Sequence, residues 1–243
     1  MVSAAVYGSV SELWLGKLAD AETRCLRVLR PAQQRQNLYA VADLLGSIIT
    51  ARLYRGQLKA AKAAFTEAPP EFLDGTPTLP KVNLRRAEVE LLLVLGDLKQ
   101  ATERYDQFTA ECAHIINAPA WFRVEVAQLG LRVALALIAS GNSLGVRRGR
   151  ALEKSATDGA SPARLARSLR HLAELDLCAG EKTSARLRLT AAEASLQRQE
   201  APFERACLLA RLATLDPSRR AQAEALQKEL GMAHPSVFER STW

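Results

Sequence analysis

Apolar residues recur along most of this chain at intervals of three and four, which is the pattern of amphipathic α-helices. Residues 84–95 show this pattern with Leu, Ala and Val, and residues 98–108 repeat it with Leu, Ala, Tyr and Phe. Gly96 lies between the two segments. Because glycine adopts positive φ without steric cost, the pattern predicts a tight turn at Gly96 between two antiparallel helices.

The same arrangement recurs every 36–45 residues. In the first three copies, Leu follows the turn residue after two positions and Ala follows it after five. In the last copy, Ala221 takes the alanine position. A small residue there lets the second helix pack closely against the first. The turn positions are Gly16, Gly56, Gly96, Gly141, Gly180 and Asp216.

This periodicity predicts six antiparallel helical hairpins. Composition agrees, because the chain is rich in the helix formers Ala, Leu, Arg and Glu and only 5 % of it is aromatic. The longest expected loop, at 69–81, is too short for a domain linker, so we expect one domain over 1–243. The expected repeats are 1–36, 37–79, 80–118, 119–160, 161–200 and 201–243.

The ten prolines fit this division, because all are expected at helix ends or in loops. Ser161-Pro162 and Asp216-Pro217 have the sequence of an N-cap followed by proline at the first helical position.

The pattern resembles the second half of the tetratricopeptide repeat: Gly, a hydrophobe two positions on, Ala at plus five and a large hydrophobe at plus nine. Gly96, Leu98, Ala101 and Tyr105 match it, and the copy from Gly56 to Phe65 matches it too. The first-helix half of the family signature lacks its tryptophan, and the period is near 40 rather than 34. Long, degenerate repeats of this kind are similar to those of large bacterial signalling ATPases, multidomain kinases and ATPase-linked transcription regulators.

The resemblance implies a right-handed α-solenoid that acts as a protein-interaction scaffold in a bacterial signalling or regulatory assembly. Its partner would be a protein or peptide, in a separate molecule or in the same longer polypeptide. Family positions that face the concave groove, carried over residue by residue, give the expected partner-binding set. These residues are Asp43, Thr50, Tyr54, Asn83, Arg86, Glu90, Gln128, Arg167, Arg170 and Glu174.

Catalytic and metal-binding motifs do not occur in the sequence. It has no Gly-x-x-x-x-Gly-Lys-Ser/Thr loop and no His-Glu-x-x-His motif. Cys112 and His114 are two residues apart and would face opposite sides of a helix, and a zinc site takes three or four ligands. We therefore expect no enzyme activity, no metal and no cofactor.

We expect neither a targeting segment nor a membrane span in this chain. Its longest apolar run, at 133–139, is far short of the roughly 20 residues of a membrane span. Four cysteines without a Cys-x-x-Cys pair suit a reducing compartment. These features predict a soluble, cytoplasmic protein with no membrane partner.

The net charge of +7 is concentrated in the second half, where residues 121–243 hold 19 basic and 13 acidic side chains. Basic side chains are most frequent in residues 147–171. This stretch suggests an alternative function, a helical repeat that binds nucleic acid or another acidic ligand. The expected basic patch is Arg147, Arg148, Arg150, Lys154 and Arg164. A second alternative is a structural repeat segment of a larger multidomain kinase or ATPase.

Overall fold

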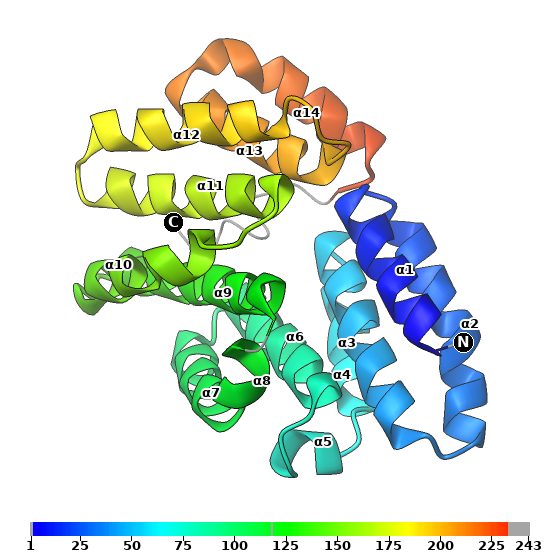
Figure 1. Cartoon of the computed structure of the whole chain (residues 1–243). Helices are drawn as coiled ribbons and strands as arrows, with labels where there is room; N and C mark the ends of the chain where they lie inside the picture. The colour runs from blue at the N-terminus through cyan, green and yellow to red at the C-terminus, as the bar shows by residue number, and fades with distance from the viewer. Residues whose placement is uncertain (1, 118, 233–243) are drawn as a thin grey trace. The chain divides into compact units, whose positions relative to one another are not determined.

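The protein is all-α. The computed structural model describes residues 2–117 and 119–232, and these residues form helices and connecting turns without any strand. They divide into two compact units (Figure 1). Unit 1 extends through Ile115 and includes the chain again from Leu230, whereas unit 2 is formed by Ile116–Glu229. The single domain expected from the sequence stays a prediction.

Unit 1 contains three helix pairs in chain order. The first helices of these pairs pack on one another, α1 on α3 and α3 on α6. A short helix, α5, lies in the connection before α6. The helices are α1 (Val2–Trp14), α2 (Leu18–Gln34), α3 (Leu38–Tyr54), α4 (Leu58–Thr66), α5 (Glu71–Asp74), α6 (Leu79–Leu95), α7 (Leu98–Glu111) and the start of α8 (Ala113–Asn117).

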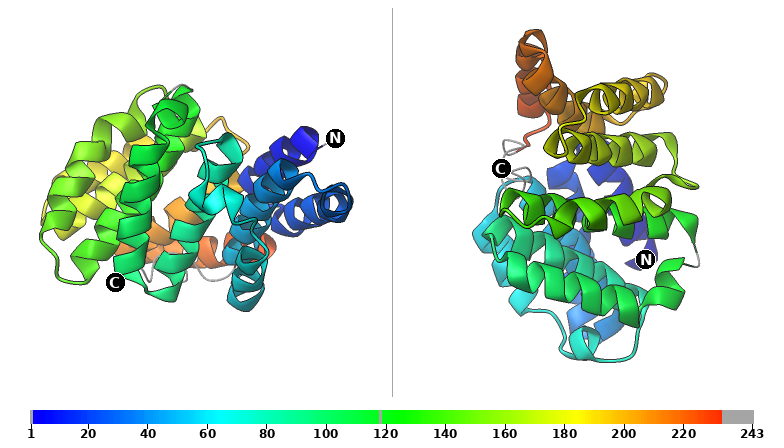
Figure 2. Two further views of the ribbon diagram at one scale, coloured as in Figure 1. Left: turned by 90° about the horizontal axis from the view of Figure 1, so that it is seen from below. Right: turned by 90° about the vertical axis from the view of Figure 1, so that its left-hand side faces the viewer.

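Unit 2 contains the other three pairs, which are stacked side by side (Figure 2). Its first helices, α9, α11 and α13, again contact one another in order. A core of leucine and alanine, including Leu131, Leu172 and Leu175, fills the space between α9, α10 and α11. The helices are α9 (Ala120–Ala139), α10 (Leu144–Thr157), α11 (Pro162–Cys178), α12 (Lys182–Leu196), α13 (Pro202–Leu215), the 3₁₀ helix η1 (Pro217–Arg219) and α14 (Arg220–Glu229).

The five predicted glycine turns are confirmed. Each glycine joins the two helices of a pair and has a φ between 71° and 84°. At Gly96 the backbone N–H of Asp97 donates to Leu92 O at 3.0 Å, and Gly96 N–H donates to Leu93 O at 3.1 Å, which satisfies carbonyls at the end of α6. The glycines are Gly16, Gly56, Gly96, Gly141 and Gly180.

The alanine five residues beyond the glycine is buried in four pairs, at Ala21, Ala61, Ala101 and Ala185. The predicted alanine of the last pair, Ala221, is wrong. Asp216 has an extended conformation with φ −137°, and η1 follows it directly. This turn shifts the register of α14, so that Ala221 is exposed and the buried alanine is Ala223.

The proline prediction holds at Pro162 and Pro202, which begin α11 and α13. It is wrong for Pro31, which lies inside the last turns of α2. That helix continues to Gln34, since a proline near its end removes a single hydrogen bond. Pro235 lies outside the described residues.

The expected loop at 69–81 is partly wrong, because it contains α5 and the first residues of α6. Lys81 holds this connection in place. Its side chain is 2 % exposed, and Nζ donates to Gly75 O at 2.7 Å and pairs with Glu111 Oε2 at 2.9 Å.

Candidate functional site

Polar side chains of neighbouring first helices pair with one another in unit 2. Arg164 of α11 donates through Nε and Nη2 to Glu125 Oε1 of α9, at 3.0 and 2.8 Å. One turn away, Gln128 Nε2 donates to Ser168 Oγ at 2.9 Å and to Arg164 O at 2.8 Å. Ser168 Oγ in turn donates to Ala156 O at 2.6 Å. These bonds join α9, α10 and α11.

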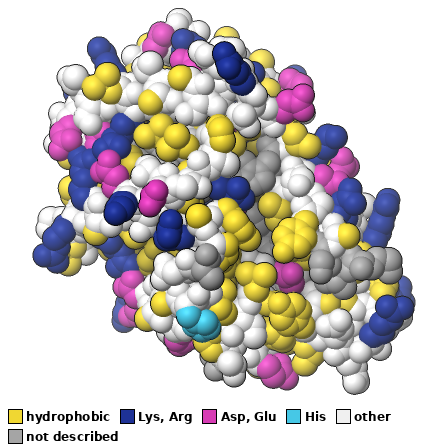
Figure 3. Space-filling model, viewed as in Figure 1, with side chains coloured by type: hydrophobic (Ala, Val, Ile, Leu, Met, Phe, Trp, Pro, Cys, Tyr) yellow, Lys and Arg dark blue, Asp and Glu magenta, His cyan; other side chains and the backbone are white. Residues whose placement is uncertain are grey.

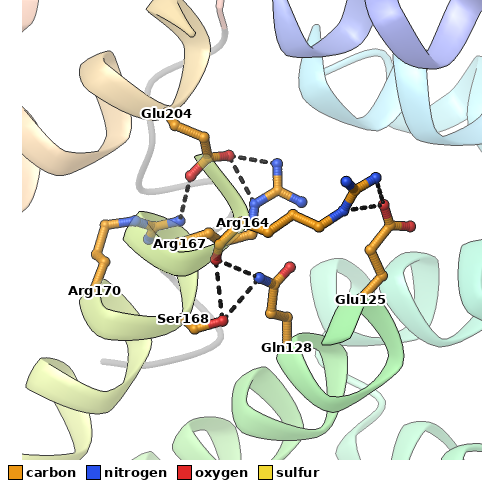
Figure 4. A network of polar contacts seen from close by, with 7 residues as sticks. All are labelled: Glu125, Gln128, Arg164, Arg167, Ser168, Arg170 and Glu204. Atoms are coloured by element: carbon orange, nitrogen blue, oxygen red, sulfur yellow. Dashed lines mark hydrogen bonds and ion pairs between the residues drawn. The ribbon is translucent and has the colours of Figure 1, made fainter. Parts of the chain in front are cut away.

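The same kind of pairing continues between α11 and α13. Glu204 is 1 % exposed; Arg167 forms a double contact with it, and the Nη2 atom of Arg170 lies 3.8 Å from its second oxygen (Figure 4). Further along the two helices, Arg211 pairs with Glu174 at 2.9 Å. Buried charges of opposite sign therefore tie these first helices together.

His171 lies among these arginines and is 5 % exposed. Burial, and then the positive charges of Arg170, Arg132, Arg167 and Arg211, lower its pKa well below the usual value. The ring is therefore neutral at physiological pH. A neutral imidazole in this position does not add to the positive charge of the cluster.

Unit 1 has a related contact with different chemistry. Asp43 of α3 accepts a hydrogen bond from Asn83 Nδ2 of α6 at 2.5 Å. The two helices approach closely here because Gly46 has no side chain: a Cβ at Gly46 would lie 3.2 Å from the Asn83 carbonyl. Asp43 is 8 % exposed, and no Lys or Arg among the described residues forms an ion pair with it. Burial raises the pKa of its carboxyl group, and the Asn83 hydrogen bond opposes that rise.

Two exposed tyrosines accompany this carboxylate. Tyr39 lies one helical turn before Asp43 on α3 and is 50 % exposed, and Tyr7 of α1 is 60 % exposed. Tyr39 also packs edge-to-face on Phe72 of α5, with ring centroids 6.2 Å apart. The pKa of Tyr39 is raised by partial burial and then by the neighbouring Asp43 and Tyr7. Tyr39 thus lies beside Asp43 on α3, and Tyr7 lies on α1, the helix that packs on α3.

The paired residues of successive first helices are 37–40 positions apart in sequence. We call this set the first-helix ladder. It was not foreseen from the sequence, although complementary side chains at the repeat spacing are a signal that could have revealed it. Its members are Asp43–Asn83, Glu125–Arg164, Gln128–Ser168, Arg167–Glu204 and Glu174–Arg211.

Most residues of the expected partner-binding set lie on or beside this ladder. Tyr54, Asn83, Arg86 and Arg167 are half-buried. The remaining six are buried, and their role in binding stays a prediction. The buried residues are Asp43, Thr50, Glu90, Gln128, Arg170 and Glu174.

The expected basic patch is divided between exposed and paired side chains. Arg147 and Lys154 are exposed, and Arg148 is half-buried. Arg150 contacts Asp176 at 2.6 Å and Glu181 at 2.8 Å. Arg164 pairs with Glu125 and lies 5.6 Å from the ring centre of Trp121.

Acidic side chains accompany the basic ones over this region. Figure 3 shows Lys and Arg intermixed with Asp and Glu over α10, α11 and α12. Arg188 adds to the mixture, because it pairs with both Asp176 and Glu153. The field of the basic stretch is therefore partly neutralised by its own neighbours.

Within the described ranges, no three His, Cys, Asp or Glu side chains are placed to hold a metal ion. The four cysteines are free thiols, of which Cys25, Cys112 and Cys207 are buried and Cys178 is exposed. Across the same ranges, no helix combines the length and apolar character needed to cross a bilayer.

The chain was compared with protein-family models, with curated proteins and with solved structures, and nothing in the three comparisons matches it. The chemistry of the first-helix faces is accordingly the basis for assigning a function.

Proposed function

We propose that this protein is a tetratricopeptide-like interaction scaffold that binds a partner protein through its first helices. In this proposal the six helix pairs form a right-handed α-solenoid, and the protein is a cytoplasmic, non-enzymatic component of a bacterial signalling assembly. The glycine turns and the buried alanines that follow them support the repeat assignment. Contacts between successive first helices, as a stacked repeat requires, support it further.

The exposed aromatic rings on the first helices of unit 1 carry this proposal. Tyr7 and Tyr39 keep 60 % and 50 % of their surface exposed, although the helices that carry them, α1 and α3, pack on each other. Tyrosine is enriched in protein interfaces, because its ring supplies apolar area and its hydroxyl supplies a hydrogen bond. Its side chain also has few rotatable bonds, so little entropy is lost on binding.

The contacts of the basic stretch favour a protein partner over nucleic acid. Arg150, Arg164 and Arg167 already pair with carboxylates of other helices. Phosphate binding would have to compete with these contacts, whereas exposed tyrosines have no such competitor.

Site-specific photo-crosslinking in the native cells tests the proposal. p-Benzoylphenylalanine placed at Tyr7 or Tyr39 is expected to give a discrete protein adduct. The matched control position is Leu187 on α12, a second helix, where the side chain is 68 % exposed. Adducts from Leu187 alone, or equal adducts from all three positions, would contradict binding through the first helices.

A further inference from the structure

The carboxylate of Asp43 has an unusual environment for a buried acid. It is 8 % exposed, yet its partner among the described residues is the neutral amide of Asn83 rather than a cation. Removing a carboxylate from water is costly unless an opposite charge compensates. Hydrophobic residues would have served packing between α3 and α6 without that cost. The position of Asp43 therefore requires another explanation.

Its surroundings suit a positive charge. Tyr39 is one turn away on the same helix, and Tyr7 lies on α1, which packs on α3. Both rings are at least half exposed, and the negative face of an aromatic ring attracts an ammonium or guanidinium group. A carboxylate beside two accessible rings is complementary to a cation with an apolar stem.

The contact with Asn83 narrows the choice of cation. Asn83 Nδ2 already occupies one carboxylate oxygen of Asp43 at 2.5 Å. The planar fork of arginine binds best when both oxygens are available. A lysine ammonium is a compact charge on a flexible stem and needs a single oxygen. Lysine therefore suits the second carboxylate oxygen of Asp43 better than arginine does.

We infer that Asp43, Tyr7 and Tyr39 form a recognition site for a lysine side chain of the partner protein. This inference rests on the proposed scaffold function and names the chemistry of its contact. The ammonium group lies against Asp43, and the lysine stem contacts the rings of Tyr7 and Tyr39. Asn83 is a positioning residue, because it fixes the orientation of the carboxylate from α6.

Nuclear magnetic resonance of the full chain with labelled tyrosine rings tests this site. The chain has four tyrosines, so each ring signal is readily assigned. The probe is acetyl-Ala-Lys-Ala-amide, and the comparison peptide carries norleucine in place of lysine. Saturable shifts of Tyr7 and Tyr39 with the lysine peptide, but without movement of the buried Tyr105, are expected. Equal shifts with the norleucine peptide would overturn the inference.

Variants distinguish the contribution of the Asp43 charge to lysine-peptide binding from that of the tyrosine rings. Asp43→Asn keeps an oxygen that accepts from Asn83 but removes the charge, and it is expected to weaken lysine-peptide binding about tenfold. The exposed Tyr7 can be changed with little effect on folding, and Tyr7→Leu should weaken binding about two- to fivefold. Glu103→Gln, at an exposed acid on α7, is the matched control and should change nothing. Unchanged binding in both Asp43→Asn and Tyr7→Leu would overturn the site.

Two further results distinguish this inference from the scaffold proposal. A protein adduct at Tyr39 together with no lysine-peptide binding would reject the lysine site and leave the scaffold standing. Lysine-peptide binding without any adduct at Tyr7 or Tyr39 would reject the scaffold. A concentration-dependent dimer that Asp43→Asn dissolves, measured by sedimentation velocity, would identify a second copy of this chain as the occupant and overturn the assignment to a separate partner.

Discussion

Asp43 shows how a single residue can reduce stability at the place where we propose that a partner binds. Its carboxylate lies between α3 and α6 with a neutral hydrogen-bond partner and no ion pair among the described residues. Among the described residues, the titratable groups that interact with it are Tyr39 on its own helix and the Cys25 thiol on α2, and neither supplies a positive charge. Binding sites commonly contain such locally unfavourable groups.

Asp43→Asn is therefore expected to stabilise the protein at neutral pH. Because the folded-state pKa of Asp43 is raised, its protonated form favours folding, and that contribution is lost as pH rises through the folded pKa. The variant should melt at a higher temperature than wild type at pH 7, and the difference should shrink as pH falls and disappear below the usual range of aspartate.

Thermal unfolding followed by circular dichroism at several pH values measures this difference. The control Glu103→Gln should follow the wild-type curve at every pH. A lower melting temperature for Asp43→Asn at pH 7 would contradict the assignment of an uncompensated carboxylate.

At the scale of elements, glycine has two separate roles in the helix pairs. Gly96 provides a positive φ of 78° at the turn, and a Cβ there would meet nothing within 4 Å. Gly145, in the first turn of α10, provides space instead. A Cβ at Gly145 would lie 2.5 Å from Ala134 O and 3.0 Å from Ile138 N of α9, which are backbone atoms. The close approach of α9 and α10 depends on this missing side chain.

Replacing each glycine by alanine should separate the two roles. Gly96→Ala is expected to cost about 1–2 kcal/mol, the penalty for an L-residue in the left-handed region. Gly145→Ala should cost more, about 3 kcal/mol or above, because the helix backbones must move apart. Urea unfolding measures both free energies, and equal losses in the two variants would contradict the steric argument.

The contacts between first helices have a measurable energetic role. Glu204→Gln removes the charge that Arg167 and Arg170 share, and it should lower the free energy of unfolding by about 2–4 kcal/mol. The matched control is Glu193→Gln, which removes the ion pair between Glu193 and Arg219. Both of these side chains are about 40 % exposed. That change should cost less than about 1 kcal/mol. Similar losses in urea titrations of the two variants would show that burial does not strengthen the ladder.

The sequence predicted the helix pairs because their periodicity and turn residues are local signals. The all-helical fold and the five glycine turns are confirmed. The register predicted after Asp216 is wrong, because a 3₁₀ helix follows this residue. That helix depends on Ser218 N–H and Oγ, which donate to the aspartate side chain. The ladder was missed because each of its contacts joins residues some 40 positions apart, and polar residues on a helix give no local sign of burial. Tyr39 was missed for a similar reason: its exposure depends on how α1, α3 and α5 pack.

At the scale of the whole molecule, net charge is a poor guide to the partner. The chain has a formal charge of +7, concentrated in the second half. Arg150, Arg164 and Arg188 nevertheless contact carboxylates at 2.6–2.9 Å, so much of that charge acts within the fold. Interaction with a polyanion depends on the charge that remains available at the surface.

We therefore expect weak, non-specific binding to nucleic acid. In fluorescence anisotropy with a labelled 20-base-pair duplex, the dissociation constant at about 150 mM salt should be weaker than roughly 100 μM. Replacing the exposed Arg147 and Lys154 by Glu should remove the residual binding seen at low salt. Sub-micromolar binding that falls steeply with salt would instead favour the nucleic-acid alternative.

The first-helix ladder has a consequence for how such a protein can evolve. Three junctions between neighbouring first helices have different complementary pairs. An acid meets an amide at Asp43–Asn83 and an acid meets a base at Glu125–Arg164, whereas the junction of α11 and α13 has both orders, at Arg167–Glu204 and Glu174–Arg211. A duplicated or transplanted repeat would bring like charges, or a charge and an apolar group, into a buried junction. The helix pairs of this chain are thus not interchangeable, and copying one of them into another position would require compensating changes at the buried junctions.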